Sequence, residues 1–280
     1  MLLSELTGGF LFGTMNKDTI IVSMTTWPPR EQCAVEAMRN LTQQEHSEPL
    51  HFVLVLSKEE WTMESSKHLL QEMQEMGVEV IWDDGNIISH KKLIPTLEKY
   101  PDSPILVVDD DMRYRAGFLQ TIIDDHKAHP NDIIYGKSGS HIEIRRGKIL
   151  DGLSQKGLFT YPGRVTYNEK PGSASILYPA HTFTDKRFFD RNLFMKLCPT
   201  CDETWQWAFC VMKVCTYRCM TDNNHPYTIG NPPKPLFHTN VTRCTGFHNA
   251  IAEMFPEYKI ELKKRIDENP IKYNPKYDEL

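Results

Sequence analysis

Short apolar runs alternate with segments of helical periodicity through the first half of the chain. Runs rich in β-branched residues predict strands at residues 19–24, 52–56, 78–82, 105–108 and 132–135. Apolar residues spaced three or four positions apart predict helices at residues 30–42, 61–76, 91–100 and 115–128. Strands and helices that alternate over short connections form βαβ units, which build a parallel sheet with right-handed crossovers.

The pattern is less regular after residue 135. A hairpin is predicted around Arg146 and Gly147, and a strand at residues 175–178. Helices are predicted at residues 186–197, 202–214, 247–254 and 258–269. The glycine- and tyrosine-rich residues 152–171 predict a long mobile loop over a ligand site. No repeat or linker divides the chain, so we predict a single α/β domain over residues 1–280, with a mostly parallel sheet, flanking helices and an elaborated C-terminal half.

Composition narrows the class of protein. The 280 residues carry a net charge of −5 and are 40% hydrophobic, which favours an ordinary globular protein and disfavours a nucleic-acid binder with a basic face. No stretch approaches the roughly 18 consecutive apolar residues that span a bilayer. The first fifteen residues contain no early Lys or Arg and no long apolar core. We therefore expect a cytoplasmic protein with at most peripheral membrane association.

The chain has seven cysteines, five of them within residues 198–219. Cys198 and Cys201 form a Cys-x-x-Cys pair, but the later cysteines offer no second pair of this kind. A structural zinc site requires two well-spaced pairs, so free and mostly buried thiols are the favoured interpretation and zinc the alternative. Free thiols agree with a reducing compartment.

Three consecutive carboxylates follow the apolar run 105–108, at Asp109, Asp110 and Asp111. Like charges this close raise one another's pKa and destabilise the fold. A divalent cation removes that repulsion, and Mg²⁺ or Mn²⁺ is usually held by one or two carboxylates together with substrate phosphates. The alternative is a solvated acidic turn that caps the helix predicted after it.

Polar residues also follow the other predicted strands. Because the carboxyl ends of parallel strands lie at one edge of a sheet, these residues can converge in one crevice. Such a crevice suits a nucleoside diphosphate. Hydroxyl and acid groups can bind its nucleobase and ribose, and a metal cation can bind its diphosphate. A lysine pair at residues 91–92 suits phosphates too, although it can equally be a solvated helix start. We call the residues predicted to bind this nucleotide the donor-binding residues. They are Thr25, Thr26, Asp83, Asp84, Lys91, Lys92, Asp109 and Asp110.

Asp202 and Glu203 form a second acidic point, with Trp205 and Trp207 beside them. A transferase must deprotonate an acceptor hydroxyl, and a carboxylate within hydrogen-bond reach is the usual base. We predict Asp202 in that role, with Glu203 second; the alternative is that Asp202 caps a helix. The tryptophans suit stacking on a sugar ring, but on an apolar helix a core position is the favoured interpretation.

Three segments together resemble a family of bacterial GT-A glycosyltransferases from polysaccharide and capsule biosynthesis. They are residues 89–95 (Ser-His-Lys-Lys-Leu-Ile-Pro), residues 101–114 with their Asp-Asp-Asp, and residues 197–205 (Leu-Cys-Pro-Thr-Cys-Asp-Glu-Thr-Trp). The resemblance covers most of residues 19–258. It implies a GT-A-like fold with a nucleotide-sugar-binding half at about residues 17–135 and an acceptor-binding, catalytic half at about residues 136–280.

The resemblance also implies a reaction and its residues. The donor would be a nucleoside-diphosphate sugar, with a UDP-sugar favoured, and the acceptor a hydroxyl of a glycan or other molecule. In the DXD motif Asp111 would be the direct ligand of Mn²⁺ or Mg²⁺, with Asp109 nearer the ribose. Asp202 would be the base of an inverting reaction, although Glu203 stands where related sequences carry aspartate. His225, His238 and His248 are candidates for a further metal ligand, with His238 preferred.

Two other functions stay open from the sequence. A sugar nucleotidyltransferase also uses acids at a strand end, but commonly has a glycine-rich basic loop after its first strand, and residues 25–29 (Thr-Thr-Trp-Pro-Pro) are neither. The chain also lacks a P-loop and a Gly-x-Gly-x-x-Gly motif. A non-catalytic sugar-nucleotide-binding protein would retain the acids at 109–111 without needing Asp202.

Overall fold

A computed structural model of the chain describes residues 16–136, 139–152, 165–167, 169–172, 174–221, 226–230, 233 and 236–269. The strands are β1 (Ile20–Thr25), β2 (Leu50–Ser57), β3 (Glu79–Asp83), β4 (Ile105–Val108), β5 (Met112–Arg113), β6 (Ile133–Tyr135), β7 (Gly139–Arg145), β8 (Lys148–Asp151), β9 (Val165–Thr166), β10 (Glu169–Pro171), β11 (Ser175–Tyr178), β12 (Tyr217–Cys219) and β13 (Tyr227–Thr228). The α-helices are α1 (Glu31–Thr42), α2 (Lys67–Glu75), α3 (Ile94–Lys99), α4 (Phe118–Ala128), α5 (Arg191–Leu197), α6 (Asp202–Met212), α7 (Phe237–Met254) and α8 (Pro256–Glu268). Short 3₁₀ helices lie at Pro28–Arg30, Ile88–Lys92 and Lys186–Phe189.

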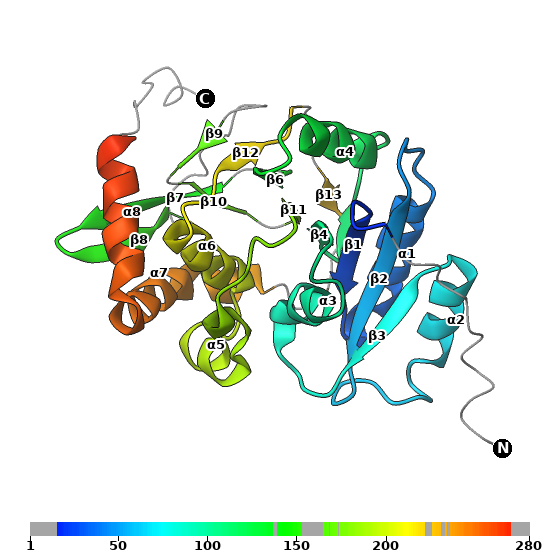
Figure 1. Cartoon of the computed structure of the whole chain (residues 1–280). Helices are drawn as coiled ribbons and strands as arrows, with labels where there is room; N and C mark the ends of the chain where they lie inside the picture. Colours follow the sequence, from blue (N-terminus) through cyan, green and yellow to red (C-terminus); the bar gives the residue numbers. More distant parts are fainter. Residues whose placement is uncertain are drawn as a thin grey trace.

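The central sheet has the strand order β3-β2-β1-β4-β11-β6-β12-β9 (Figure 1). Strands β3, β2, β1 and β4 are parallel, so their carboxyl ends lie at one edge, as the sequence predicts. Strand β11 is inserted antiparallel between β4 and β6. The expected α/β architecture, a mostly parallel sheet flanked by helices, is confirmed.

Both faces of the sheet are covered, because successive side chains of a strand point to opposite faces. Val22 and Met24 of β1 pack in one cluster with buried residues of α1, α2 and α4. Ile21, on the opposite face, belongs to a second cluster with residues of α3, α5, α6, α7 and α8. Figure 1 shows α5–α8 gathered beside the strands of the second half. This burial on both faces explains why the strands read as continuous apolar runs.

Several predicted boundaries are wrong, each for a local reason. The helix expected at 61–76 begins at Lys67, because Thr62 and Ser65 bond each other in a turn. The helix expected at 115–128 begins at Phe118, after Gly117 at φ 82°. The helix expected at 186–197 is interrupted at Asp190, whose carboxylate accepts the Leu193 N–H and caps α5.

Two larger segments also differ from expectation. The helix expected at 247–254 begins ten residues earlier, at Phe237. Of the predicted loop 152–171, the end is not loop: Val165–Thr166 pairs with β12, and Glu169–Pro171 pairs with β7. Residues 153–164 of that loop lie outside the described residues. The hairpin is confirmed, since β7 and β8 pair around Arg146 and Gly147, both at positive φ.

No helix within the described part of the chain combines the length and the apolar character needed to cross a bilayer.

Candidate active site

The first acid after β4, Asp109, is fixed by the start of β11. Its Oδ2 accepts the Ala174 N–H at 2.7 Å, and its own backbone N–H donates to the Tyr114 hydroxyl at 2.8 Å. That hydroxyl in turn donates to the Ala174 carbonyl at 2.6 Å. Ala174 adopts φ 96°, a backbone conformation that is strained for a residue with a Cβ. Ala174 is thus held in a strained conformation just before β11, and its N–H fixes the Asp109 carboxylate.

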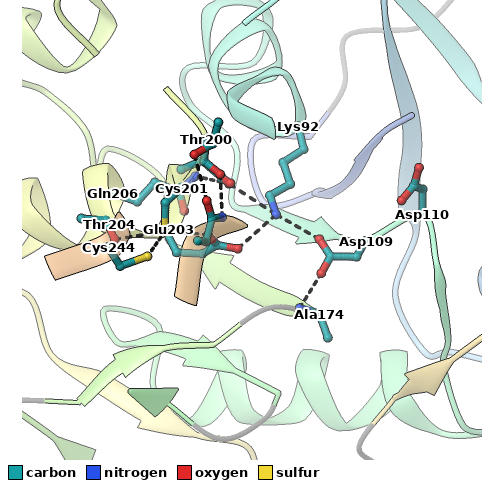
Figure 2. A network of polar contacts seen from close by, with 12 residues as sticks. Lys92, Asp109, Asp110, Ala174, Thr200, Cys201, Glu203, Thr204, Gln206 and Cys244 are labelled. Atoms are coloured by element: carbon teal, nitrogen blue, oxygen red, sulfur yellow. Dashed lines mark hydrogen bonds and ion pairs between the residues drawn. The ribbon is translucent and has the colours of Figure 1, made fainter. Parts of the chain in front are cut away.

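Lys92 joins this acid to the second acidic point (Figure 2). Its Nζ lies 3.0 Å from Asp109 Oδ1, 3.3 Å from Asp202 Oδ2 and 3.6 Å from Glu203 Oε1. The residue is only 6% exposed, so the alternative of a solvated helix start is wrong. Acids separated by more than ninety residues therefore share one buried ammonium group, and we call these four residues the Lys92 cluster.

The charges of the Lys92 cluster are mutually dependent. Burial acts to lower the pKa of Lys92, but Asp109, Asp202 and Glu203 together raise it well above its usual value, so the amine stays charged. Burial acts to raise the pKa of Asp109, but Lys92 and the Ala174 N–H hold it below its usual range. Loss of one buried partner would leave the others uncompensated.

Asp202 is the first residue of α6 rather than its cap, because Cys201 occupies the N-cap position. The residue is 1% exposed, and its carboxylate accepts from Gln206 Nε2 at 3.1 Å. Gln206 is held in turn by the Tyr178 hydroxyl, which donates to its Oε1 at 2.6 Å. The start of a helix stabilises negative charge. Asp202 is therefore a buried carboxylate whose Oδ2 contacts both Gln206 and Lys92.

Glu203 is the more open of the two acids. Its side chain is 14% exposed, against 2% for that of Asp202. Burial raises its pKa above the usual value and the neighbouring Asp202 adds to this, while Lys92 and Lys170 act in the opposite direction. A carboxylate with a raised pKa and some access is suited to accept a proton at neutral pH.

Asp110 and Asp111 meet a cation that the sequence did not single out. Arg30, at the end of the 3₁₀ helix before α1, places its Nη1 2.8 Å from Asp110 Oδ1 and 3.0 Å from Asp111 Oδ2. The Thr26 hydroxyl donates to Asp110 Oδ2 at 2.7 Å. Asp111 has fewer such contacts than Asp110. Burial and the charge of Asp109 raise the pKa of Asp111 to about 6.

Four of the predicted donor-binding residues lie outside these contacts. The Thr25 hydroxyl donates to the Val55 carbonyl. The carboxylate of Asp83 pairs with Arg191 at 2.7 Å, and the exposed Asp84 pairs with Lys58. Lys91 pairs with Glu60 and donates to Asn86. The last three form ion pairs of their own beside the strand ends rather than joining the Lys92 cluster.

The aromatic and histidine candidates separate clearly. Trp205 and Trp207 are fully buried, which confirms the core interpretation over sugar stacking. His248 is buried between Asp151 and the Tyr258 hydroxyl, away from the triad. His225 and the side chain of His238 lie outside the described residues.

The acids at residues 109–111 suit a divalent cation that also takes ligands from a substrate. Within the described residues, no group of three His, Cys, Asp or Glu side chains is placed to hold a metal. A closed, all-protein metal cage is therefore not formed there. However, Mg²⁺ and Mn²⁺ sites that include substrate phosphates need only one or two carboxylates. Asp111 and Asp109 would supply them. Burial and then the charge of Asp109 raise the pKa of Asp111, and a cation would relieve the repulsion from Asp109.

The turn before α6 is fastened to α7. Asn240 Oδ1 accepts from the Thr200 hydroxyl at 2.8 Å, and its Nδ2 donates to the Thr200 carbonyl at 2.7 Å. One turn along α7, Cys244 Sγ lies 3.0 Å from Cys201 Sγ. All seven cysteines are free, as the sequence predicts. These contacts hold residues 200–201 and so position the two acids that follow.

Sequence reasoning missed four residues that shape the site: Arg30, Tyr114, Ala174 and Gln206. Gln206 had a usable signal, since it lies four positions after Asp202 and so on the same helix face. Tyr114 and Arg30 read as ordinary helix-flanking residues. Their roles depend on contacts with residues 60 and 80 positions away, at Ala174 and Asp110.

The sequence matches no protein-family model and no curated protein sequence. Solved structures of TarS from S. aureus share its fold. The structure of TarS residues 1–349 has a TM-score of 0.55 and 14% identity, covering 93% of this chain and 77% of that one. The same fragment in complex with UDP has a TM-score of 0.56 at 14% identity, with the same coverage. Its complex with UDP-GlcNAc has a TM-score of 0.53 at 14% identity, covering 91% and 68%. The chain spans 43% of the longer TarS structure, at 12% identity. This likeness confirms the expected GT-A-like glycosyltransferase fold.

Proposed function

We propose that the protein transfers a sugar from a nucleoside-diphosphate sugar, with a UDP-sugar favoured, to a hydroxyl of a glycan or other acceptor. The observation that carries the proposal is the Lys92 cluster. Asp109, which we assign to the donor side, and Asp202 and Glu203, which we assign to the acceptor side, all lie within 3.6 Å of one ammonium group. The fold shared with TarS, a glycosyltransferase whose structures contain UDP and UDP-GlcNAc, supports this proposal.

On the donor side, we assign the diphosphate to the edge of the sheet beyond β4. Asp111 and Asp109 would hold Mn²⁺ or Mg²⁺ there. When bound, the cation stabilises the charge that builds on the leaving diphosphate. Lys92 remains close enough to Asp109 to balance the acids while the donor is absent.

On the acceptor side, the reaction needs a base. The acceptor oxygen forms a bond to the anomeric carbon, the bond from that carbon to the diphosphate breaks, and the hydroxyl proton passes to a carboxylate. The greater exposure and raised pKa of Glu203 favour it over Asp202, reversing the order that the sequence suggests. Asp202 would position Lys92 and the start of α6. Direct attack of this kind inverts the anomeric centre.

The test compares turnover of the Glu203→Gln and Asp202→Asn variants at saturating donor and acceptor. Removal of a general base costs about 10²–10⁴-fold in rate. We expect that loss in Glu203→Gln with donor affinity near native, and a smaller loss in Asp202→Asn. Asp84→Asn, which removes an exposed acid outside the cluster, is the matched control.

The outcomes separate the alternatives. A larger loss in Asp202→Asn returns the base to Asp202. Full turnover in both variants contradicts an inverting transferase with a base in this cluster. Donor binding without turnover, over a range of hydroxyl acceptors, would favour the non-catalytic sugar-nucleotide-binding protein.

A further inference from the structure

Arg30 lies between the acid triad and a segment more than two hundred residues away. Its Nη1 contacts Asp110 at 2.8 Å and Asp111 at 3.0 Å, while its Nε donates to the Pro233 carbonyl at 3.1 Å. The side chain is 11% exposed, so water screens these contacts only weakly. A guanidinium is permanently charged and presents its donors in a rigid fork. Arg30 is therefore a fixed positive charge beside the triad.

The two acids that share Arg30 differ in their other support. Asp110 also accepts from the Thr26 hydroxyl at 2.7 Å, and its side chain is 8% exposed. The Asp111 side chain is 16% exposed, and Arg30 is the one ion-pair partner that the described residues give it. Loss of the Arg30 contact would leave Asp110 anchored but Asp111 free to turn toward another cation.

We infer that Arg30 is a built-in counter-cation, which holds Asp111 in the metal-free protein and competes with the divalent cation for that carboxylate. The inference rests on the metal-binding part of the proposed function. Two cations cannot both approach the same face of one carboxylate without repelling each other. Binding of the divalent cation therefore requires Asp111 to exchange its contact with Arg30, whereas Asp110 retains both Arg30 and Thr26.

Replacing Arg30 should therefore change metal affinity in the direction opposite to the replacement of a residue that only supports the fold of the site. Loss of a supporting residue loosens the site and weakens cation binding. Loss of a competing charge strengthens it. Couplings between two bound species in proteins are typically 5–150-fold, so we expect an effect of about tenfold.

The experiment titrates Mn²⁺ into the full chain in the presence of saturating UDP, because the proposed site includes phosphate ligands. Binding is followed by calorimetry and by the electron paramagnetic resonance signal of free Mn²⁺. Arg30→Gln should bind Mn²⁺ about tenfold more tightly than the native chain. Arg30→Lys, which retains the charge, should stay near native affinity. Arg39→Gln is the matched control, because it removes the same charge from the same helical region at an exposed pair with Glu72.

A second measurement follows the native chain itself, again in the presence of saturating UDP. Arginine Nε–Hε signals of the native chain, observed by NMR during a Mg²⁺ titration, should show the Arg30 signal shifting as its contact with Asp111 is exchanged. The Arg30→Lys spectrum assigns that signal. An Arg30 signal that is unchanged at saturating Mg²⁺ would overturn the inference.

The failure of the inference and that of the proposed function are distinguishable. Native Mn²⁺ binding that Arg30→Gln leaves unchanged or weakens overturns the competition and leaves the metal site standing. Mn²⁺ binding that is detected only in Arg30→Gln supports the competition in its strongest form. Absence of binding in both proteins overturns the inference together with the metal-dependent part of the proposed function.

Discussion

At the scale of single residues, the site is governed by carboxylates that outnumber their cations. Lys92 serves three acids and Arg30 serves two. Such an arrangement is costly in a protein interior unless every charge keeps a partner. The stability of the fold and the proposed binding of a cation therefore depend on the same few groups.

Lys92→Met should be strongly destabilising. Removing one partner of a buried ionic group costs about 3–5 kcal/mol, because the remaining charges are left uncompensated. Urea unfolding at neutral pH measures the loss, with Lys58→Met as control, since the pair of Lys58 with Asp84 is exposed. Without Lys92 the folded acids bind protons more readily, so the deficit should shrink as the pH falls. Equal midpoints for the two variants would contradict the role assigned to Lys92.

Asp111→Asn should stabilise the metal-free protein at neutral pH. The pKa of Asp111 is about 6 in the folded protein, above its usual value of 3.8. The folded state thus binds the proton more tightly, and native stability falls as the pH rises from about 4 to about 6. A pKa difference of one is worth about 1.4 kcal/mol, so we expect a gain of about 1–3 kcal/mol at pH 7.

The gain in Asp111→Asn should vanish below about pH 4, where both states of the native chain are protonated. Thermal unfolding between pH 3.5 and 7.5 tests this dependence. A gain that is constant over that range would instead indicate a packing effect.

The sequence identified the acids and Lys92, but neither the pairing of Lys92 with those acids nor the role of Arg30. Asp109–Asp111 directly follow an apolar run, and Asp202–Glu203 begin a predicted helix. Both positions can be recognised from the local sequence. The burial of Lys92 and the reach of Arg30 arise only when distant segments meet. Lys92 lies in a 3₁₀ turn, and the sequence of residues 88–94 does not predict whether that turn is buried or exposed.

At the scale of elements, α7 supports the turn before Asp202 and Glu203, the acids to which we assign catalysis. Its Asn240 bonds both polar groups of Thr200, two residues before Asp202. The sequence-based helix began at residue 247 and so omitted this contact. Residues 238–240 and 242–243 are polar, so the sequence offers no apolar periodicity from which the first turns of α7 could be predicted. The contacts of Asn240 and of the buried Cys244 join this part of α7 to residues 200–201.

Asn240→Ala should therefore lower turnover about tenfold, equivalent to about 1.4 kcal/mol in the barrier, while donor affinity stays near native. Asn249→Ala is the matched control, because Asn249 also lies on α7 and bonds a backbone, that of Ile149, with its amide. Both variants should lose about 1–2 kcal/mol of stability. Kinetics and urea unfolding separate the two effects. Equal turnover in the two variants would show that α7 supports the fold alone.

At the scale of the whole molecule, the sheet extends across the boundary between the two halves that the sequence suggests. Strand β11, from the second half, pairs with β4 of the first half along four residues and with β6 on its other side. The periodicity of each strand could be read from the chain. The position of β11 in the sheet could not be predicted, because the sequence of residues 175–178 would suit an internal strand at any place in the sheet.

This sharing predicts one cooperative unfolding transition. Leu177 is fully buried in β11, and Leu→Ala changes in a core cost about 2–5 kcal/mol. In Leu177→Ala, tryptophan fluorescence and far-UV circular dichroism should shift together to one lower midpoint. A first-half transition that keeps the native midpoint would contradict the shared core. Met63→Ala, at an exposed position, is the control.

The place of β11 also sets an order in time. While the chain is being synthesised, β4 and β6 exist long before Ser175–Tyr178 can pair with them. Until then, each of these buried strands has an unpaired edge, which is the kind of surface that recruits foreign strands. A nascent chain that stalls between residue 135 and residue 178 should thus be the species most prone to aggregate and most dependent on chaperones.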